Sequence, residues 1–549
     1  MTITLQERLI RKIPKAIVHL RAQRRAGRFG LLFGAGVSID LGYPQWPDLV
    51  KKIANRPEVG AAKIWQRLEA QGDAGRPVTR SLASVTQMLF SQFRERRIVE
   101  QSWSPSLTYV EELGIKTEWL QIIHDELYAG LDRATREQKL RNHPYLNAFL
   151  PAVKESQLTV TYNFDDSLEL MLALARTPDE RLRTRGYEVI DSPSLQCRHQ
   201  HGVIYHPNGY LPAEFGDGAS ADVVFSDDSF QDQLLTATNG GYLHLTNHLT
   251  RNTCLLVGIS LEDSTLQSML RQNAVRNPGN IHYAVHFTPD ADAQNEESEH
   301  AIFTANFESF GVYTLFLGNA QIRALAELIL MDEGSFASLF AKYKPKFVYY
   351  LIGSVGAGKS TAAANFRGLI TYDEWVDERL PDLAKPEAEV SAEKVDPMND
   401  WIAEQFRKKN FALHGCEEGL HLVDRAPLDP LTFGPVEERS QKAAALTETI
   451  TDDGTRRIVP GHIIELKATV EELQVRTRRR HKDWPLAELD RLLQNIDQVY
   501  GPVTRSTVCT SGRTAAAVAK EIARIIYLDP YQPVDIQAEM AKHAGPAVA

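Results

Sequence analysis

Two glycine-rich segments constrain the fold of this chain more than any other feature of its sequence. The first reads GAGVSIDLGYPQW from Gly34 to Trp46, and the second reads GSVGAGKS from Gly353 to Ser360, roughly 300 residues later. Each directly follows an apolar run that is typical of a β-strand, at 29–33 and at 347–352. A tight turn after a strand places backbone N–H groups where they can face a phosphate. The sequence therefore predicts two nucleotide sites.

Composition limits the kind of protein. A chain of 549 residues that is 43% hydrophobic and 24% charged can bury the cores of two or three domains. Its net charge of −10 gives no global basic field, so composition predicts no nucleic-acid partner. The four cysteines form no CxxC pair, which argues against a disulfide framework or a thiolate zinc site. The scattered cysteines fit a reducing cytoplasm, which is the expected location. No apolar run approaches the roughly 20 residues that cross a bilayer, so we expect no membrane partner.

The N-terminal segment from Arg8 to Arg28 is basic and amphipathic, as organelle-targeting leaders are. The first expected strand begins at Phe29, so cleavage of a leader would leave little chain before the fold starts. We therefore expect a solvated or subunit-contacting first helix in its place.

Strand-like and helical segments alternate through the first part of the chain. This pattern is typical of a parallel sheet with crossover helices, and a mainly helical region is expected from 47 to about 149. The prediction is an α/β protein with a Rossmann-like parallel sheet and a helical insertion at 1–340, a P-loop α/β domain at 341–535 and a tail at 536–549. Residues 334–346 are expected to form a linker. The expected strands of the first sheet are 29–33, 158–162, 203–205, 222–225, 254–258, 282–286 and 312–316, followed by a helix at 322–330.

The first glycine segment suits contact with a pyrophosphate. Gly34 and Gly36 lack side chains where the chain turns sharply, and Ser38 offers a hydroxyl at the start of a helix. Ordinary loop packing is the alternative for this turn, and a helix N-cap is the alternative for the polar segment at 163–166. Open parallel sheets bind ligands at the carboxyl ends of their strands. The polar residues that follow predicted strands are Asn163, Asp165 and Asp263.

Five segments of the first 300 residues occur in an order that is typical of one family. GAGVS is followed by Gly-Tyr-Pro-Gln-Trp, and then come TYNFDD at 161–166, VIYHPNGYLP at 203–212, VVFSDDSF at 223–230 and LLVGISLED at 255–263. These segments resemble those of the sirtuins, and more closely those of the sirtuin-like NAD-cleaving domains of bacterial antiphage defence systems. The resemblance implies that this part of the chain cleaves the bond between nicotinamide and ribose in NAD.

The resemblance also implies roles for individual residues. Asn163 would hold the ribose or the water, His206 would take a proton from the nucleophile, and Asp165 would bind ribose hydroxyls or orient its neighbours. These three are the expected catalytic residues. The residues expected to contact NAD are Gly34, Ala35, Gly36, Ser38, Trp46, Asn163, Asp165, Gly258, Ser260 and Asp263.

The chain departs from the family pattern in two places. It lacks the two CxxC pairs that hold zinc in sirtuin deacylases, which favours a hydrolase over a peptide deacylase. The family's catalytic histidine usually stands immediately before a glycine, where this chain has Asn208 before Gly209. We predict His206 as the catalytic histidine because it ends a predicted strand, and His201, directly before Gly202, is the alternative.

The second glycine segment matches Gly-x-x-x-x-Gly-Lys-Ser between a strand and a helix, which is the context of a P-loop. Lys359 is expected to reach the β- and γ-phosphates of ATP or another nucleoside triphosphate, and Ser360 to ligate Mg²⁺. The residues expected to bind this nucleotide are Gly353, Gly356, Gly358, Lys359, Ser360, Thr361, Arg476 and Arg480.

Acidic and basic residues after later strands narrow the class of P-loop protein. Asp373 and Glu374 follow a second strand, Asp424-Arg425 ends a third, and an arginine-rich helix follows a fourth at 463–466. This resembles the nucleoside and nucleotide kinase group. The resemblance implies that Asp424 supports Mg²⁺ and that Asp373 or Glu374 binds or deprotonates a substrate hydroxyl. It also implies that the arginines neutralise transferring charge, and the alternative for them is a solvated helix face.

The two halves together predict an antiphage defence NAD glycohydrolase that yields ADP-ribose and nicotinamide. Its P-loop half is expected to be a kinase-like sensor of a nucleotide or a phage-derived trigger, in a homo-oligomer. The alternative is a P-loop kinase or NTPase whose sirtuin-like domain binds NAD or an NAD derivative without cleaving it. Asn208, at the position where the family often has histidine, keeps this alternative open.

Overall fold

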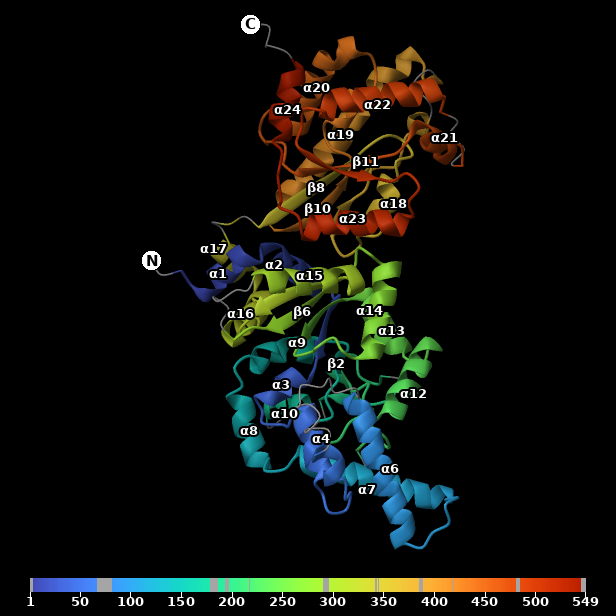
Figure 1. Cartoon of the computed structure of the whole chain (residues 1–549). Helices are drawn as coiled ribbons and strands as arrows, with labels where there is room; N and C mark the ends of the chain where they lie inside the picture. The colour runs from blue at the N-terminus through green and yellow to red at the C-terminus, as the bar shows by residue number, and fades with distance from the viewer. Residues whose placement is uncertain are drawn as a thin grey trace. The chain divides into compact units, whose positions relative to one another are not determined.

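The computed structural model divides into two compact units (Figure 1). The seven-stranded unit comprises Arg28–Asn273 and Ile281–Leu330, and the five-stranded unit comprises Met1–Gly27, Ala274–Asn280 and Met331–Ala549. Residues 1–27 thus group with the C-terminal part of the chain, whereas the prediction assigned them to the first domain. The residues that the structure describes are 3–66, 81–177, 186–192, 197–216, 218–289, 296–340, 343, 345–384, 389–416, 418–479 and 484–544.

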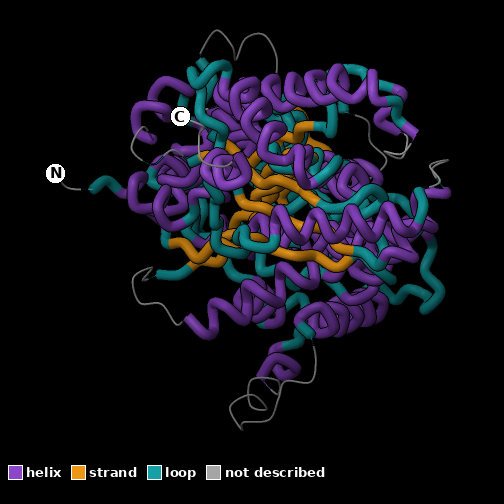
Figure 2. Tube along the Cα trace, turned by 90° about the horizontal axis from the view of Figure 1, so that it is seen from above, coloured by secondary structure: helices purple, strands orange, loops and turns teal. Residues whose placement is uncertain are grey.

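The sheet of the seven-stranded unit is parallel throughout, in the order β3-β4-β2-β1-β5-β6-β7. Its central strands β1 and β5 are continuous apolar runs, as expected of strands that are covered on both faces. Figure 2 distinguishes the strands from the helices that alternate with them along the chain. The strands are β1 (Phe29–Phe33), β2 (Thr159–Thr161), β3 (Glu188–Ile190), β4 (Val203–Tyr205), β5 (Thr253–Val257), β6 (His282–Phe287) and β7 (Val312–Leu317).

A helical insertion separates β1 from β2, as predicted. One of its long helices, α7, begins with a capping box in which Thr108 and Glu111 each bond the other's backbone N–H group. The helices from β1 onward are α3 (Ala35–Ile39), α4 (Trp46–Ala54), α6 (Leu82–Glu100), α7 (Tyr109–Leu127), α8 (Arg133–Arg141), η1 (Leu146–Phe149), α9 (Leu150–Glu155), α10 (Ser167–Leu174), α12 (Asp227–Thr238), α13 (Leu243–Arg251), α14 (Ser264–Arg276), α15 (Glu296–Phe310) and α16 (Asn319–Leu330).

The sheet of the five-stranded unit is also parallel, in the order β12-β11-β8-β10-β9. Its strands are β8 (Lys346–Ile352), β9 (Ile370–Tyr372), β10 (Gly419–Asp424), β11 (His462–Lys467) and β12 (Arg505–Cys509). Its helices are α1 (Leu5–Lys12), α2 (Pro14–Arg25), α17 (Glu333–Phe340), α18 (Lys359–Ala363), η2 (Pro381–Ala384), α19 (Ala392–Gly415), η4 (Asp429–Thr432), η5 (Val436–Glu438), α20 (Arg439–Thr451), α21 (Val470–Arg478), α22 (Leu486–Tyr500), α23 (Ala515–Tyr527) and α24 (Ile536–Ala544).

The structure differs from the predicted elements in five places. The run at 222–225 is irregular, although Val223 and Phe225 are buried, and β3 and β12 were not predicted. Most of the expected linker at 334–346 lies in α17, which buries Phe336 and Phe340. The first part of the expected tail is helix α24, which buries Ile536 and Met540. In these two helices, burial of apolar side chains outweighs the local sequence signal.

Helix α2 is buried inside the five-stranded unit, so the expectation of a solvated or subunit-contacting helix is wrong for it. Arg21 is 2% exposed and donates to the Met331 carbonyl oxygen at 2.8 Å. Its guanidinium lies 3.5 Å from the centre of the Phe336 ring and 3.2 Å from a Glu333 carboxylate oxygen. Arg25 contacts Glu418, directly before β10, at 2.7 Å. These contacts hold α2 against α17 and the start of β10.

Among the described residues, no helix combines the length and apolarity that a bilayer-spanning segment requires.

We predict that Arg21→Ala destabilises the five-stranded unit. The change removes the buried cation that pairs with the largely buried Glu418 and with the exposed Glu333. Because Arg25 still contacts Glu418, we expect a loss of about 3 kcal/mol, the lower end of the cost of breaking a buried ion pair. Urea unfolding, monitored by hydrogen-exchange mass spectrometry, reports the stability of this unit separately from that of the seven-stranded unit. Arg8→Ala, at an exposed position of α1, is the control, and equal stability of the two variants would contradict the prediction.

Candidate functional site

The candidate site of the seven-stranded unit lies where the strand order reverses. Strand β1 has β2 on one side and β5 on the other, and parallel sheets bind ligands at the carboxyl edge of such a point. A cavity of about 970 Å³ opens at this edge. The predicted NAD-contacting residues that line it are Gly34, Ala35, Gly36, Trp46, Gly258, Ser260 and Asp263.

Three glycines let the two central strand ends approach each other closely. A Cβ atom on Gly34 would lie 2.6 Å from the Gly258 carbonyl oxygen, and one on Gly36 would lie 2.8 Å from the Gly258 Cα. Gly258 itself has a φ of +71°, which favours glycine. The Gly36 N–H group donates to the Gly258 oxygen at 3.0 Å, so this donor is already used within the protein. The glycines that were expected to contact a pyrophosphate therefore also serve loop packing, which was the alternative.

Trp46 forms an aromatic wall of the cavity. Its ring stacks on Phe225 at 6.0 Å and lies 5.6 Å from Phe230, and it is 36% exposed. Phe230 also lines the cavity, at the start of α12. A partly exposed indole of this kind offers a flat surface for a planar ring.

Asn163, Asp165 and Ser38 do not line the cavity, but they are hydrogen-bonded to one another and to Gly34, which does. The Asn163 amide donates to Ser38 Oγ at 2.8 Å and to the Gly34 carbonyl oxygen at 3.1 Å. Ser38 Oγ donates to Asp165 Oδ2 at 2.7 Å, and Asp165 Oδ1 accepts the Ser167 N–H group at 3.0 Å. Within the described part of the chain, Asn163 Oδ1 is buried and has no hydrogen-bond partner. It is therefore an acceptor that a ligand hydroxyl or a water could satisfy.

The histidine candidates do not line this cavity. His206 is fully buried, whereas Asn208, two residues later, lies on the cavity wall. The Asn208 amide donates to the Tyr162 carbonyl oxygen at 3.4 Å, and its oxygen accepts from Gln233 at 2.9 Å. His201 is exposed and its Nδ1 lies 2.9 Å from the Glu155 carbonyl oxygen. The catalytic role of either histidine remains a prediction.

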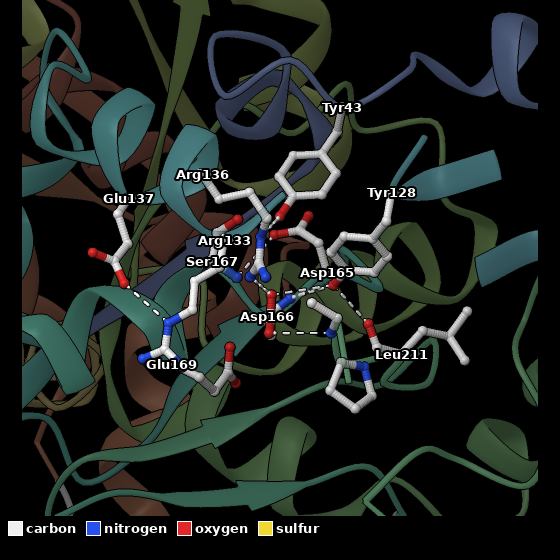
Figure 3. Close-up of polar contacts among 12 residues, drawn as sticks. Tyr43, Tyr128, Arg133, Arg136, Glu137, Asp165, Asp166, Ser167, Glu169 and Leu211 are labelled. Atoms are coloured by element: carbon white, nitrogen blue, oxygen red, sulfur yellow. Dashed lines mark hydrogen bonds and ion pairs between the residues drawn. The ribbon is translucent and has the colours of Figure 1, made fainter. Parts of the chain in front are cut away.

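A buried polar cluster holds the segment that follows β2 (Figure 3). Asp166 forms an ion pair with Arg136 of α8, accepts from the Tyr128 hydroxyl at 3.1 Å, and accepts the Ala213 N–H group at 3.2 Å. The Arg136 Nε donates to the Tyr43 hydroxyl at 3.1 Å. Burial raises the pKa of Asp166, and the Arg136 charge opposes that effect. The helical insertion thereby fixes the turn that carries Asn163 and Asp165.

The P-loop of the five-stranded unit joins β8 to α18, as predicted. Gly353 has a φ of +136°, and a Cβ atom on it would lie 2.4 Å from the Leu466 carbonyl oxygen. Gly356 and Gly358 also have positive φ values, so the backbone can wrap a phosphate chain. Lys359 folds over this loop, because its Nζ donates to the Gly353 carbonyl oxygen at 2.7 Å and to that of Ser354 at 3.1 Å. Burial lowers the pKa of Lys359.

Ser360 and Asp424 form a pair that fits Mg²⁺. Ser360 Oγ donates to Asp424 Oδ2 at 2.8 Å, and Asp424 Oδ1 is buried without a hydrogen-bond partner among the described residues. A hydroxyl and a carboxylate beside a phosphate loop are the ligands that Mg²⁺ uses in such sites. In the described part of the chain no group of three His, Cys, Asp or Glu side chains could hold a metal ion. Magnesium would therefore need oxygens of a bound nucleotide as well.

Of the remaining residues predicted to bind the nucleotide, only Arg476 is shown to border the P-loop. Arg476 on α21 donates to Thr510 Oγ1 at 3.0 Å and contacts the Gly356 carbonyl oxygen at 3.4 Å, so it borders the P-loop. Arg480 lies outside the described residues. Thr361 is exposed and follows Ser360 on α18.

A second cavity, of about 310 Å³, adjoins the P-loop and contains a charged pair. Arg425 Nε donates to Glu374 Oε1 at 2.9 Å, and Trp375 and Phe433 line the same space. Burial raises the pKa of Glu374, but the Arg425 charge outweighs burial and lowers that pKa to about 2. Arg425 has a φ of +74°, a strained backbone for a non-glycine residue. Asp373, the other predicted acid, is exposed and does not line the cavity.

Several residues of the first cavity were not among the predicted site residues. Tyr162, Phe230 and Asn208 line the first cavity, and Gln233 holds Asn208, because the fold brings α12 to the carboxyl edge of the sheet. An acidic segment at 223–230 was singled out, but its role as the start of α12 was not predicted. Lys409 of α19 was also missed, although its Nζ donates to the backbone oxygens of both Glu374 and Asp424.

One family model matches part of the chain. It describes a SIR2-like domain and matches residues 157–305, which include the segments around Asn163, His206 and Gly258 and begin after the first glycine segment. This part of the chain is therefore similar to SIR2-like domains. A search of curated proteins gave no match.

Solved structures resemble the chain over about a third of its length. Two are of deoxyadenosine kinase from M. mycoides, and each match covers 32% of this chain and 96% of the kinase chain. The structure with products dCMP and a flexible dCDP bound has 18% identity and a TM-score of 0.25. The structure with dATP bound has 15% identity and a TM-score of 0.26. A third is shikimate kinase from Acinetobacter baumannii in complex with shikimate, with 18% identity, coverage of 34% and 96%, and a TM-score of 0.22. At these TM-scores the likeness carries no weight for function.

We predict that Lys359→Ala weakens binding of ATP and GTP by about tenfold to a hundredfold, because a hydrogen bond to a charged group contributes about 1.5–3 kcal/mol. Calorimetric titration with Mg²⁺ present measures the affinity. Lys542→Ala, which changes an exposed lysine of α24, is the matched control. Equal affinities of Lys359→Ala and the unchanged protein would remove the basis for a nucleotide site here.

Proposed function

We propose that the seven-stranded unit binds NAD and cleaves the bond between nicotinamide and ribose. The observation that carries this proposal is the position of Asn163. Its side chain lies behind the glycine turn at the switch point, with an amide oxygen that no described residue satisfies. The nearby cavity combines backbone approach at three glycines with the Trp46 wall, which suits a dinucleotide.

The proposed reaction needs little acid catalysis because nicotinamide leaves as a neutral molecule from a cationic substrate. The electron pair of the C1′–N bond moves to the ring nitrogen, and water forms the new bond to C1′ and releases a proton to the solvent. We propose that Asn163 Oδ1, a buried acceptor without a partner among the described residues, accepts a hydrogen bond from that water or from a ribose hydroxyl. Ser38 and Asp165 orient the Asn163 amide through their hydrogen bonds.

The five-stranded unit is proposed to bind a nucleoside triphosphate with Mg²⁺ and to regulate NAD cleavage. Support comes from the P-loop, from the Ser360–Asp424 pair and from Arg476 beside the loop. We propose a role in antiphage defence, in which a nucleotide or phage-derived trigger releases NAD depletion. This role rests on the resemblance of the five N-terminal segments. The proposed cytoplasmic location rests on the scattered cysteines, and a homo-oligomer is proposed because assembly could complete or uncover each NAD pocket.

A second candidate function is favoured by one observation. The side chain that reaches the cavity near the end of β4 is the amide of Asn208, while His206 is buried. An amide cannot take a proton from water. If cleavage requires a side-chain base at this position, the cavity would bind NAD or an NAD derivative without cleaving it. In that case the P-loop unit, with Glu374 and Arg425 beside the loop, would be a kinase or NTPase under NAD control.

Asn163→Ala is predicted to reduce nicotinamide release from NAD by about a hundredfold or more, the usual cost of removing a preorganised polar group from a reaction site. Nicotinamide is measured by chromatography with purified full-length protein. Asn142→Ala, at the exposed C-cap of α8, is the control. NAD that binds but is never cleaved by the unchanged protein would favour the second candidate, and a fully active Asn163→Ala would refute the proposed mechanism.

Lys359→Ala is predicted to change the nucleotide dependence of NAD cleavage, because an unregulated enzyme would deplete its own host. A shift from roughly 1% to 99% active requires about 5.5 kcal/mol of differential binding, which several phosphate contacts can supply. Cleavage rates of the full-length protein and of Lys359→Ala are compared across ATP, GTP and deoxynucleotides. Identical rates in both proteins under every nucleotide would show that the two units work independently.

A further inference from the structure

His206 is enclosed by hydrogen-bond partners and has no access to the cavity. Its relative exposure is 0%, and Tyr210 packs on its ring at 4.7 Å between centroids. Nδ1 lies 2.9 Å from the Asn163 carbonyl oxygen, and Nε2 lies 2.8 Å from Glu169 Oε1 of α10. Glu169 is itself 2% exposed. Both ring nitrogens are therefore committed to groups inside the protein.

Both partners of the ring are acceptors, which determines its protonation. A carbonyl oxygen and a carboxylate can only accept, and a neutral imidazole has a single N–H group to donate. While Glu169 is ionised, only the imidazolium form of His206 satisfies both contacts. The charged groups that face it are Glu169 and, farther off, Asp165; burial lowers the pKa of His206, but these carboxylates and the Asn163 oxygen outweigh burial and raise it. Such a ring has no lone pair with which to take a proton from water.

The backbone of Asn163 is what the ring holds. The carbonyl contacted by His206 belongs to the residue whose side chain donates to Ser38 and Gly34. Glu169 lies in the first turn of α10, directly after the segment that contains Asp165 and Asp166. The buried pair therefore links the end of β4 to the turn after β2.

We propose that His206 and Glu169 are a positioning pair that orients Asn163, and that Asn208 is the residue of this segment that touches the ligand. This inference rests on the proposed NAD site. Asn208 lies on the cavity wall, and Gln233 fixes its amide by donating to Oδ1, which leaves an amide hydrogen to point at the ligand. The predicted base role of His206 is thereby replaced by an orienting role.

Glu169→Gln tests the pair because it keeps the shape and removes the charge. The rate of nicotinamide release by the full-length protein is expected to be nearly flat between pH 6 and 8, because each ring nitrogen faces a buried acceptor that favours its proton. In Glu169→Gln the pKa of His206 falls, the ring loses a donor as pH rises, and kcat is expected to drop about tenfold across that range. A catalytic base predicts the opposite sign: the rate of the unchanged protein rises with pH, and Glu169→Gln extends activity to lower pH. Glu327→Gln, on the exposed face of α16, is the control.

Asn208→Ala separates ligand contact from orientation. It is expected to raise KM or Kd for NAD about tenfold with little change in kcat, whereas His206→Gln is expected to lower kcat with little change in KM. The reverse split would overturn the assignment.

A measurement without NAD keeps the inference testable if the proposed function fails. In full-length protein labelled with ¹⁵N-histidine, the His206 signals are assigned by their loss in His206→Gln. Two protonated ring nitrogens at pH 7 are expected, and one unprotonated nitrogen would refute the positioning pair. Absence of both NAD binding and nicotinamide release in the unchanged protein would instead refute the proposed function.

Discussion

The seven-stranded unit depends on the close approach of two backbone segments at the centre of its sheet. Gly34 and Gly36 pack against Gly258 at distances that no side chain would permit. This contact brings the turns after β1 and β5 together at the point where the strand order reverses, and the cavity opens beside it. Any side chain at these glycines would separate the strand ends and displace the Asn163 amide, which donates to the Gly34 oxygen.

Around this contact, polar side chains are held in two layers. The inner layer joins Asn163, Ser38 and Asp165, and the outer layer joins Asp166 to Arg136 and Tyr128 of the helical insertion. Each buried charge in these layers has a partner of opposite charge or several donors, as desolvation requires. The helices between β1 and β2 therefore do more than cover the sheet, because they supply the groups that orient the turn after β2.

In the five-stranded unit, too, a buried side chain from a neighbouring helix holds the segments that carry the site residues. The ends of β9 and β10 carry Glu374 and Asp424, and Lys409 donates to the backbone oxygens of both residues from α19. Burial lowers the pKa of Lys409 to about 8, and the nearby carboxylates oppose that effect. A single buried lysine thus sets the spacing between the acid beside the second cavity and the acid beside the P-loop.

The sequence by itself predicted the features that depend on local order. An apolar run followed by glycines indicates a strand and a tight turn wherever it occurs, so both glycine segments, most strands and the residues after them were found. β3 and β12 were not found, because short strands at sheet edges owe their conformation to pairing with a neighbour. The placement of α2 in the C-terminal unit was not found either, since it depends on contacts with residues more than 300 positions away.

Only the tertiary structure decided what the site side chains face. His206 and Asn208 stand two residues apart at the end of one strand, and sequence could not tell which of them reaches the cavity. Their surroundings come from α10, which supplies Glu169, and from α12, which supplies Gln233. Burial and hydrogen-bond partners are properties of the assembled fold, and they determine whether an imidazole can take a proton or can only hold its neighbours in place.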